Sequence, residues 1–278
     1  MKARQNQTGE DIVAGRLQDK VAIVTGAGSV GPGWGNGRAI AYRFAQEGAR
    51  VFAVDLNPQA LEETVRRVRE LGGEIRTHIA DVTSDAAIQS MVQACIQAWG
   101  RVDVLVNNVG GSRKGGPVAL SEADWDAQLD YNLKSVFLAC KHVLPHMQEQ
   151  GGGAIVNIAS TSGIRWTGSA QVGYASAKAG VIQFTRVVAV EYAPMRIRCN
   201  CVIPGQLHTP MVEVRLAGQR AGGNVEQLLA QRQSRIPLPF MGDGMDTANA
   251  ALFLASEEAR FVTGTELRVD GGMSARCD

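Results

Sequence analysis

Tyr174 and Lys178 are the residues whose types and spacing point most directly to catalysis. They lie four positions apart at the start of a segment with helical apolar spacing, residues 174–192, so the phenol and the ammonium share one helix face. A free tyrosine has a pKa near ~10 and is a poor base at neutral pH. A positive charge about 4 Å away, at an effective dielectric near 20, is worth roughly 4 kcal/mol, or about three pKa units. The pair predicts a phenol that exchanges protons near neutral pH, although the pattern alone also fits a solvated helix face.

A glycine-rich turn after the first apolar strand is the second candidate site. It reads Thr25-Gly-Ala-Gly-Ser-Val-Gly-Pro-Gly-Trp-Gly-Asn-Gly-Arg38. Glycines allow the backbone to approach a pyrophosphate, and the helix that follows offers unpaired N–H groups and the positive end of its dipole. Such a turn by itself also fits a plain strand-to-helix connection, so its interpretation depends on the residues around it.

Asp55 supplies that context because it ends the next predicted strand. A carboxylate at this position can accept hydrogen bonds from both hydroxyls of an adenosine ribose. Its charge would repel a 2′-phosphate, and neither Leu56 nor Asn57 brings a compensating cation. The pattern therefore favours NAD over NADP as the cofactor. The alternative roles for Asp55 are a solvated strand end or a helix cap before Pro58.

Apolar strand-like runs alternate with helical patterns along most of the chain, and these elements must position the candidate residues. Strands are predicted at residues 21–25, 51–54, 75–80, 102–106, 154–158, 197–203 and 266–269. Helices are predicted at residues 38–47, 58–71, 85–99, 124–147, 174–192 and 247–256. Strands that are apolar on both faces and separated by helices are typical of a parallel sheet covered on both sides. The predicted fold is α/β: a single-domain, doubly wound, Rossmann-like parallel sheet with helices on both faces.

One predicted domain covers residues 17–273, with tails at 1–16 and 274–278. Residues 206–246 break the alternation with polar helical pieces, glycines and two prolines. An excursion near the carboxyl ends of the strands is where a substrate-covering lid is expected.

Composition narrows the class of protein. Twenty-eight basic and twenty-seven acidic residues leave a net charge of +1 without a charged block, which argues against nucleic acid and anionic membranes as partners. The first residues do not resemble a signal peptide, and no apolar segment approaches the roughly 18 residues of a membrane span. Five cysteines without a CxxC pair favour reduced thiols in a cytoplasmic protein. No metal site is predicted, because His142 and His146 have no evident third ligand.

Several motifs together resemble the short-chain dehydrogenase/reductase family over about residues 17–273. The family turn TGxxxGxG is matched by Thr25-Gly26 and by Gly35-Asn36-Gly37-Arg38-Ala39, with about five extra residues between them and Asn36 at a usually aliphatic position. Further matches are Asp81-Val82, Asn107-Asn108-Val109-Gly110, Asn157-Ile158-Ala159-Ser160, Tyr174-Ala-Ser-Ala-Lys178, the segment 200–205 and Thr209.

The resemblance implies a catalytic set of Asn132, Ser160, Tyr174 and Lys178. Thr161 and Ser162 are rivals of Ser160, because the family spacing to the tyrosine is commonly one residue shorter. A buried structural hydrogen bond is the alternative role for Asn132. The implied NAD contacts are Gly26, Gly28, Ser29, Gly35, Asn36, Gly37, Asp55, Asp81, Val82, Asn108, Gly110, Tyr174, Lys178, Pro204, Gly205, Leu207 and Thr209.

The implied reaction is hydride transfer between the nicotinamide of NAD and the carbonyl or secondary-alcohol carbon of a small molecule. Alternatives on the same site are an NADP-dependent carbonyl reductase, a cis-dihydrodiol dehydrogenase, an epimerase, or a non-catalytic NAD-binding sensor. The family also suggests a homotetramer built through the helices at 124–147 and 174–192. Loop residues that would permit an anionic substrate are Arg113, Lys114, Arg165, His208 and Arg215, while Trp166 and Met211 could give apolar contact.

Overall fold

Seven parallel strands form the central sheet of the computed structural model, which describes residues 4–5, 11–12, 15–216, 218 and 222–277. Their order across the sheet is β5-β4-β3-β6-β7-β8-β9. The strands are β3 (Val21–Thr25), β4 (Arg50–Asp55), β5 (Ile75–Ile79), β6 (Val104–Asn107), β7 (Gly153–Ile158), β8 (Ile197–Pro204) and β9 (Glu266–Val269). The strand order reverses between β3 and β6, which is where open α/β sheets bind their ligands.

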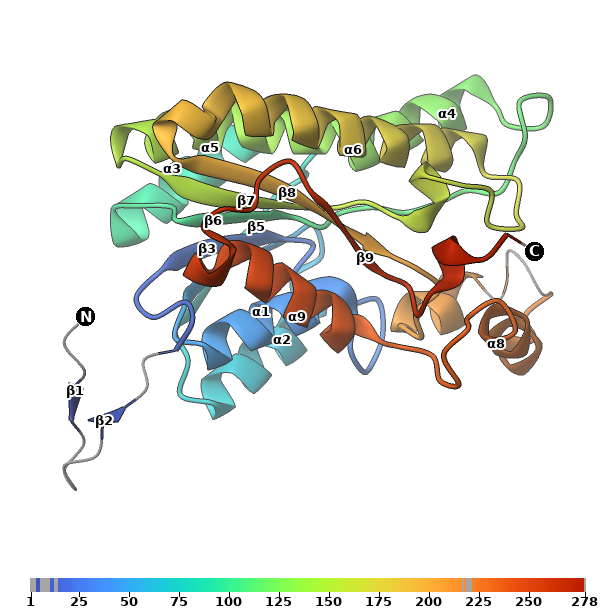
Figure 1. The fold of residues 1–278 in the computed structure, drawn as a ribbon, viewed down its shortest axis with the longest axis horizontal. Helices are drawn as coiled ribbons and strands as arrows, with labels where there is room; N and C mark the ends of the chain where they lie inside the picture. The colour runs from blue at the N-terminus through green and yellow to red at the C-terminus, as the bar shows by residue number, and fades with distance from the viewer. Residues whose placement is uncertain (1–3, 6–10, 13–14, 217, 219–221, 278) are drawn as a thin grey trace.

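Helices cover both faces of this sheet (Figure 1). One layer consists of α3 (Asp85–Trp99), α5 (Ser135–Glu149) and α6 (Val172–Tyr192). The opposite layer consists of α1 (Asn36–Gln46), α2 (Pro58–Glu70) and α9 (Gly244–Ala255). The predicted doubly wound, Rossmann-like fold is confirmed.

The central strands divide their side chains between two hydrophobic cores. Along β3, Val21 and Ile23 pack in the core beneath α3, α5 and α6, whereas Ala22 and Val24 pack in the core beneath α1 and α9. Alternate residues of a strand point to opposite faces, so a strand covered on both sides has to be apolar throughout. A strand at the edge of the sheet is less completely covered and can carry polar residues. Accordingly, Arg76 and Thr77 of the edge strand β5 are exposed.

Local signals set several helix ends at the predicted residues. The Asn57 side chain accepts a hydrogen bond from the Gln59 N–H at the start of α2, directly before Pro58. Ser84 caps α3 in the same way, and Gly100 ends α3 with φ +74°, a left-handed conformation that favours glycine. These contacts satisfy backbone groups that would otherwise lack partners, which explains why capping residues mark the boundaries.

Several element ends shift by a few residues, and the structure corrects or completes the sequence-based prediction in three larger segments, of which 206–246 has the helical pieces that were expected. The helix predicted at 124–147 is α4 (Glu122–Leu129), a five-residue π-helical segment (Asp130–Lys134) and α5 in succession. The segment 206–246 contains a second π-helical turn (Val212–Leu216) and the helix α8 (Val225–Gln233). Near the N-terminus, β1 (Arg4–Gln5) and β2 (Asp11–Ile12) pair antiparallel within the predicted tail. Among the described residues, no helix combines the length and apolarity needed to cross a bilayer.

Candidate active site

A cleft of about 1430 Å³ lies at the carboxyl ends of the strands. Its wall contains every residue predicted to contact NAD, and also Ser160. Asn132 does not line the cleft, because its side chain is fully buried behind the wall. The folding of the chain thus brings residues separated by more than 180 positions, from Gly26 to Thr209, to one continuous surface.

The glycine-rich turn has the shape of a phosphate cradle. A Cβ at Gly37 would lie 1.8 Å from the Gly26 carbonyl oxygen, and a Cβ at Gly28 would lie 2.6 Å from Ala60 Cβ, so only glycine fits at either position. The residue before α1, Gly35, gives no side-chain cap to the first N–H groups of the helix. An uncapped helix N-terminus beside a bare backbone suits an anionic group. The turn therefore fits the pyrophosphate of a dinucleotide.

Asp55 lies beside this turn at the end of β4. Its Oδ2 accepts a hydrogen bond from the Gly28 N–H at 3.0 Å, and its Oδ1 accepts one from the Asn57 N–H at 3.1 Å. The carboxylate is thus fixed to the glycine turn by the backbone. Each carboxylate oxygen accepts more than one hydrogen bond, so Asp55 retains capacity for a ribose hydroxyl.

The end of β6 is joined to the glycine turn by Asn108. Its Nδ2 donates to the carbonyl oxygens of Thr25 at 3.2 Å and Gly26 at 3.0 Å, and its backbone N–H donates to Thr25 Oγ1 at 3.1 Å. On the next strand connection, Asp81 Oδ1 accepts from the backbone N–H and the hydroxyl of Thr83. These bonds hold the connections around the floor of the cleft in fixed relative positions.

Lys178 places its ammonium beside Tyr174 in the middle of the cleft. Nζ lies 5.8 Å from the centroid of the Tyr174 ring and donates to the Ile158 carbonyl oxygen at 2.7 Å. Only 3% of Lys178 is exposed, and this burial lowers its pKa to about 8. Below that pH the site holds a buried positive charge next to a phenol, which is the arrangement expected from the four-residue spacing.

The π-helical segment between α4 and α5 positions Asn132. The Asn132 Nδ2 donates to the Gln128 and Gly111 carbonyl oxygens, both at 2.9 Å, while its Oδ1 accepts from the Gly111 N–H at 3.1 Å. A Cβ at the neighbouring Gly110 would lie 2.8 Å from Asn132 Oδ1 and 3.0 Å from Lys178 Nζ. Asn132, Gly110 and Lys178 are therefore in one packed cluster. Single π-helical turns are frequent at functional sites, since they redirect one side chain out of the regular spacing.

Ser160, Thr161 and Ser162 all line the cleft after β7, but their side chains have different surroundings. Ser160 is half-buried, and its Oγ accepts from the Ser162 N–H at 3.2 Å. Thr161 is buried, and Ser162 Oγ lies 3.1 Å from Thr167 Oγ1. Gln171 connects this group to α6, because its Nε2 donates to Ser162 Oγ at 2.6 Å and to Thr167 Oγ1 at 3.2 Å.

Of the residues predicted for the substrate end, Arg113 and Met211 line the cleft, whereas Lys114, Arg165, Trp166 and His208 do not. Arg165 donates to the carbonyl oxygens of Met273 and Arg276, at 3.0 and 2.6 Å, and so faces the C-terminal segment. His208 pairs with Glu213 at 2.8 Å. Lys114 is exposed outside the cleft, Trp166 is 70% exposed, and the side chain of Arg215 lies outside the described residues.

Among the cleft residues that were not singled out from the sequence are Gln171, Thr167 and Arg232. Arg232 comes from α8, is buried, and donates from Nη2 to the Leu207 carbonyl oxygen at 3.0 Å. The sequence could have indicated Gln171, because this residue directly precedes the helix that contains Tyr174. Nothing in the local sequence distinguishes Arg232, at the end of α8, from the exposed Arg235 that follows the helix.

Four cysteines are buried as free thiols in the interior, among them Cys199 and Cys201 of the apolar strand β8. Burial raises the pKa of the Cys201 thiol to about 12. Within the described ranges, no three His, Cys, Asp or Glu side chains gather as metal ligands. His142 instead lies 2.9 Å from Asp85, which also pairs with Lys141.

Comparison with known proteins identifies the class to which this fold and site belong. A family profile described as "Enoyl-(Acyl carrier protein) reductase" matches residues 32–274. A crystal structure from Burkholderia xenovorans, assigned to the short-chain dehydrogenases/reductases, is 65% identical with a TM-score of 0.93, covering 95% of this chain and all of that one. The chain belongs to the short-chain dehydrogenase/reductase family, and it is an oxidoreductase that acts on alcohol or carbonyl substrates.

Two further relatives show the range of the family. The chain is 41% identical to the (2S)-[(R)-hydroxy(phenyl)methyl]succinyl-CoA dehydrogenase subunit BbsD of Thauera aromatica, over 93% of this chain and 98% of the relative. Carveol dehydrogenase from Mycobacterium avium, solved in complex with NAD, is 34% identical with a TM-score of 0.87, and the match covers 94% of this chain and all of that one. The two substrates differ greatly, so the shared fold does not specify a substrate.

The burial of Lys178 predicts a pH-dependent change in stability on substitution. Its pKa falls from 10.5 to about 8 on folding, so the unfolded chain binds more protons between these values and stability rises with pH. The contribution of Lys178 to the free energy of unfolding is highest above pH 10.5, where Lys178 is neutral in both states, and it decreases as the pH falls toward 8. Relative to Lys178→Met, the ligand-free wild-type protein should gain roughly 2–3 kcal/mol of unfolding free energy from pH 7 to pH 10.

Urea unfolding of both proteins at the two pH values measures this gain. Lys141→Met, which removes a half-exposed lysine, is the matched control and should follow the wild-type pH profile. Parallel profiles for wild type and Lys178→Met would show that the ammonium is not buried as a charge.

Proposed function

We propose that the protein is an NAD-dependent dehydrogenase/reductase that moves hydride between nicotinamide and the carbonyl or secondary-alcohol carbon of a small molecule. The observation that carries the proposal is the buried Lys178 ammonium beside Tyr174, within a cleft whose other end is a glycine cradle. A protein that only bound a dinucleotide would not need a charged lysine in its interior, since a buried charge costs several kcal/mol.

Tyr174 is the proposed general acid and base. In oxidation its phenolate takes the proton from the alcohol hydroxyl as the C–H bond breaks, and in reduction the phenol returns that proton to the carbonyl oxygen. The bound nicotinamide supplies the chemistry of accepting or giving back the hydride. Lys178 favours the phenolate through its charge, and the Ser160 hydroxyl holds the substrate oxygen by a hydrogen bond.

Asn132 has a positioning role in this proposal. Its amide fixes the backbone at Gly111, beside the Lys178 ammonium, and so shapes the route by which the lysine exchanges protons with solvent. Asn132 is fully buried, and its side chain hydrogen-bonds to the backbone of Gly111 and Gln128. It therefore acts on the reaction through the position of Gly110 and Gly111.

Asp55 supports NAD as the preferred cofactor. Its carboxylate is tied to the glycine turn, where the adenosine ribose of a bound dinucleotide would lie. The buried cation Arg38 donates to the carbonyl oxygens of Gly31 and Gly33 in the glycine-rich loop and is already engaged there. A 2′-phosphate at this place would meet a negative charge.

Residues 17–273 are proposed to act as one domain in which the segment 206–246 is the substrate lid. The support is that residues of this segment, from Gln206 to Arg232, line the same cleft as Tyr174 and Ser160. A cytoplasmic location completes the proposal, because the free cysteines fit a reducing compartment.

A homotetramer is proposed from an apolar groove on the outer face of α5 and α6. The groove has a volume of about 440 Å³ and is lined by Leu129, Leu133, Lys134, Phe137, Gly180 and Phe184. Phe137 is 49% exposed, and on α6 Val190 is 77% exposed. Exposed apolar surface of this kind marks an interface, and a groove flanked by ridges of the same helices suits a twofold contact with a second copy. Val136, Val181 and Ile182 belong to the core instead.

Substitution of Tyr174 tests the proposed chemistry. Tyr174→Phe removes the ionisable hydroxyl and should lower NAD-dependent turnover of secondary alcohols by about 10²–10⁴-fold, with NAD affinity retained. Turnover is followed by NADH absorbance over a panel of secondary alcohols, diols and ketones, and affinity by calorimetry. Tyr192→Phe, at the far end of the same helix, is the control and should keep full activity. Undiminished turnover in Tyr174→Phe would remove this residue from the mechanism.

Cofactor preference is tested at Asp55. Asp55→Asn keeps the size and one acceptor oxygen but removes the charge, so the ratio of NADP affinity to NAD affinity should rise about tenfold, equivalent to about 1.4 kcal/mol. Titration of the wild type and the variant with both dinucleotides measures this ratio. Asp81→Asn is the matched control and should leave the ratio unchanged. A wild type that prefers NADP would reverse the cofactor assignment.

The proposed interface is tested by Phe137→Asp. A carboxylate buried against apolar side chains is strongly unfavourable, so the variant should elute as a smaller species than the wild type. Light scattering after size-exclusion chromatography gives the mass of each. Val118→Asp, at a fully exposed position away from the groove, should keep the wild-type mass. A monomeric wild type would rule out the assembly.

A further inference from the structure

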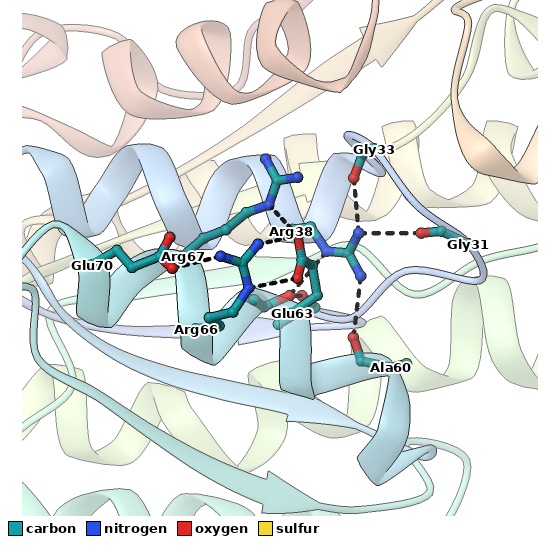
Figure 2. A network of polar contacts seen from close by, with 10 residues as sticks. Gly31, Gly33, Arg38, Ala60, Glu63, Arg66, Arg67 and Glu70 are labelled. Carbon is teal, nitrogen blue, oxygen red and sulfur yellow. Dashed lines mark hydrogen bonds and ion pairs between the residues drawn. The ribbon is translucent and has the colours of Figure 1, made fainter.

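The loop between Gly28 and Gly35, about five residues longer than the usual family turn, is organised around one buried arginine. Figure 2 shows the Arg38 guanidinium joined to the carbonyl oxygens of Gly31 and Gly33 in this loop and to that of Ala60. Nη1 donates to the carbonyl oxygens of Gly31 at 3.1 Å and Gly33 at 2.9 Å, and Nη2 donates to Ala60 at 3.5 Å. Nε donates to Thr64 Oγ1 at 3.3 Å. The planar fork of one side chain thus connects the loop to both α1 and α2.

Arg38 is buried without a carboxylate among these hydrogen-bond partners. Only 3% of it is exposed, and burial lowers its pKa from a value so high that the guanidinium stays charged at neutral pH. The charge of Glu63 acts on Arg38 and partly offsets the effect of burial on its pKa, but the Glu63 carboxylate is itself ion-paired with Arg66 and Arg67, as Figure 2 shows. Neutral carbonyls solvate the guanidinium but do not cancel its charge, so positive potential reaches the loop above it.

The base and the apex of the loop are each held by further contacts. At its base, Trp34 packs on Tyr42 with ring centroids 4.9 Å apart, and the Arg67 guanidinium lies 4.3 Å from the centroid of the Trp34 ring. At its apex, Gly31 faces the lid, where a Cβ would lie 3.2 Å from Val214 Cγ2 and 3.4 Å from Pro210 Cβ. The loop therefore bridges the glycine cradle and the lid across the cleft.

We propose that Arg38 is a positioning residue that holds the extended loop as a cover over the pyrophosphate of the bound dinucleotide and adds positive potential there. The proposal rests on the proposed function, since it requires a dinucleotide in this cleft. In this proposal the extended loop strengthens binding of the diphosphate of the dinucleotide and not of its adenosine. Arg38 acts through the loop and does not touch the reacting atoms.

Binding of two probes to purified full-length variants tests this proposal. ADP-ribose contains the diphosphate and adenosine lacks it, and both affinities are measured by calorimetry without turnover. Arg38→Gln should weaken ADP-ribose binding at least about tenfold, equivalent to about 1.4 kcal/mol, and leave adenosine binding within about twofold. Arg38→Lys keeps the charge but loses the fork, and it should show a smaller loss. Arg43→Gln, at a partly exposed position on the same helix, is the control and should bind both probes normally.

The outcomes separate this inference from the proposed function. A wild type that binds neither probe would overturn the proposed function itself. If the wild type and both Arg38 variants bind ADP-ribose with equal affinity, only the role of Arg38 is overturned. An equal loss of both probes in Arg38→Lys, with a lowered melting temperature, would also overturn it, because that pattern indicates general damage to the fold.

Discussion

A parallel sheet has to be covered by helices on both faces, and this constraint leaves only the ends of its strands open to solvent. In this protein the strand order reverses between β3 and β6, so the helices that follow these two strands diverge to opposite faces. The space between them becomes the cleft. Its floor is backbone held by Asn108 and its walls are the connections that leave each strand. The site is therefore a direct result of how the sheet is covered.

Two buried cations then give the cleft its chemical polarity. Arg38 lies under the glycine-rich end and is surrounded by carbonyl oxygens, while Lys178 lies near the middle beside Tyr174. Each costs free energy to bury, and each is held by a backbone carbonyl instead of a carboxylate that would neutralise it. In the proposed function these charges act on an anionic cofactor at one end and on a phenolate at the other. The proposal therefore explains why two buried charges that cost stability are present.

Much of the fold was predictable because local signals and burial agreed. The helix α3 begins and ends at the predicted residues, since Ser84 caps one end and Gly100 takes up the left-handed conformation at the other. The strand β3 was equally clear from an apolar run that the two cores require. The π-helical turn at Asn132 was not predictable in the same way. It depends on hydrogen bonds between the Asn132 side chain and Gly111, which is distant in sequence and brought near only by packing.

The substrate end shows the same limit. Arg165 and His208 lie in the loops that were expected to contact substrate, yet their side chains turn toward the C-terminal segment and Glu213. The direction of a loop side chain follows from its tertiary neighbours, whereas the direction of a strand or helix side chain follows from a fixed period.

The sequence by itself determined the fold class, the position of the glycine turn and the pairing of Tyr174 with Lys178, because each depends on spacing within one element or on one connection. Only the tertiary structure decided that the Lys178 ammonium is buried against Ile158, that Asn132 lies behind the cleft wall, and that Arg38 supports the extended loop. Burial and long-range hydrogen bonds depend on which elements pack together, and a local sequence pattern does not indicate the packing partners of an element.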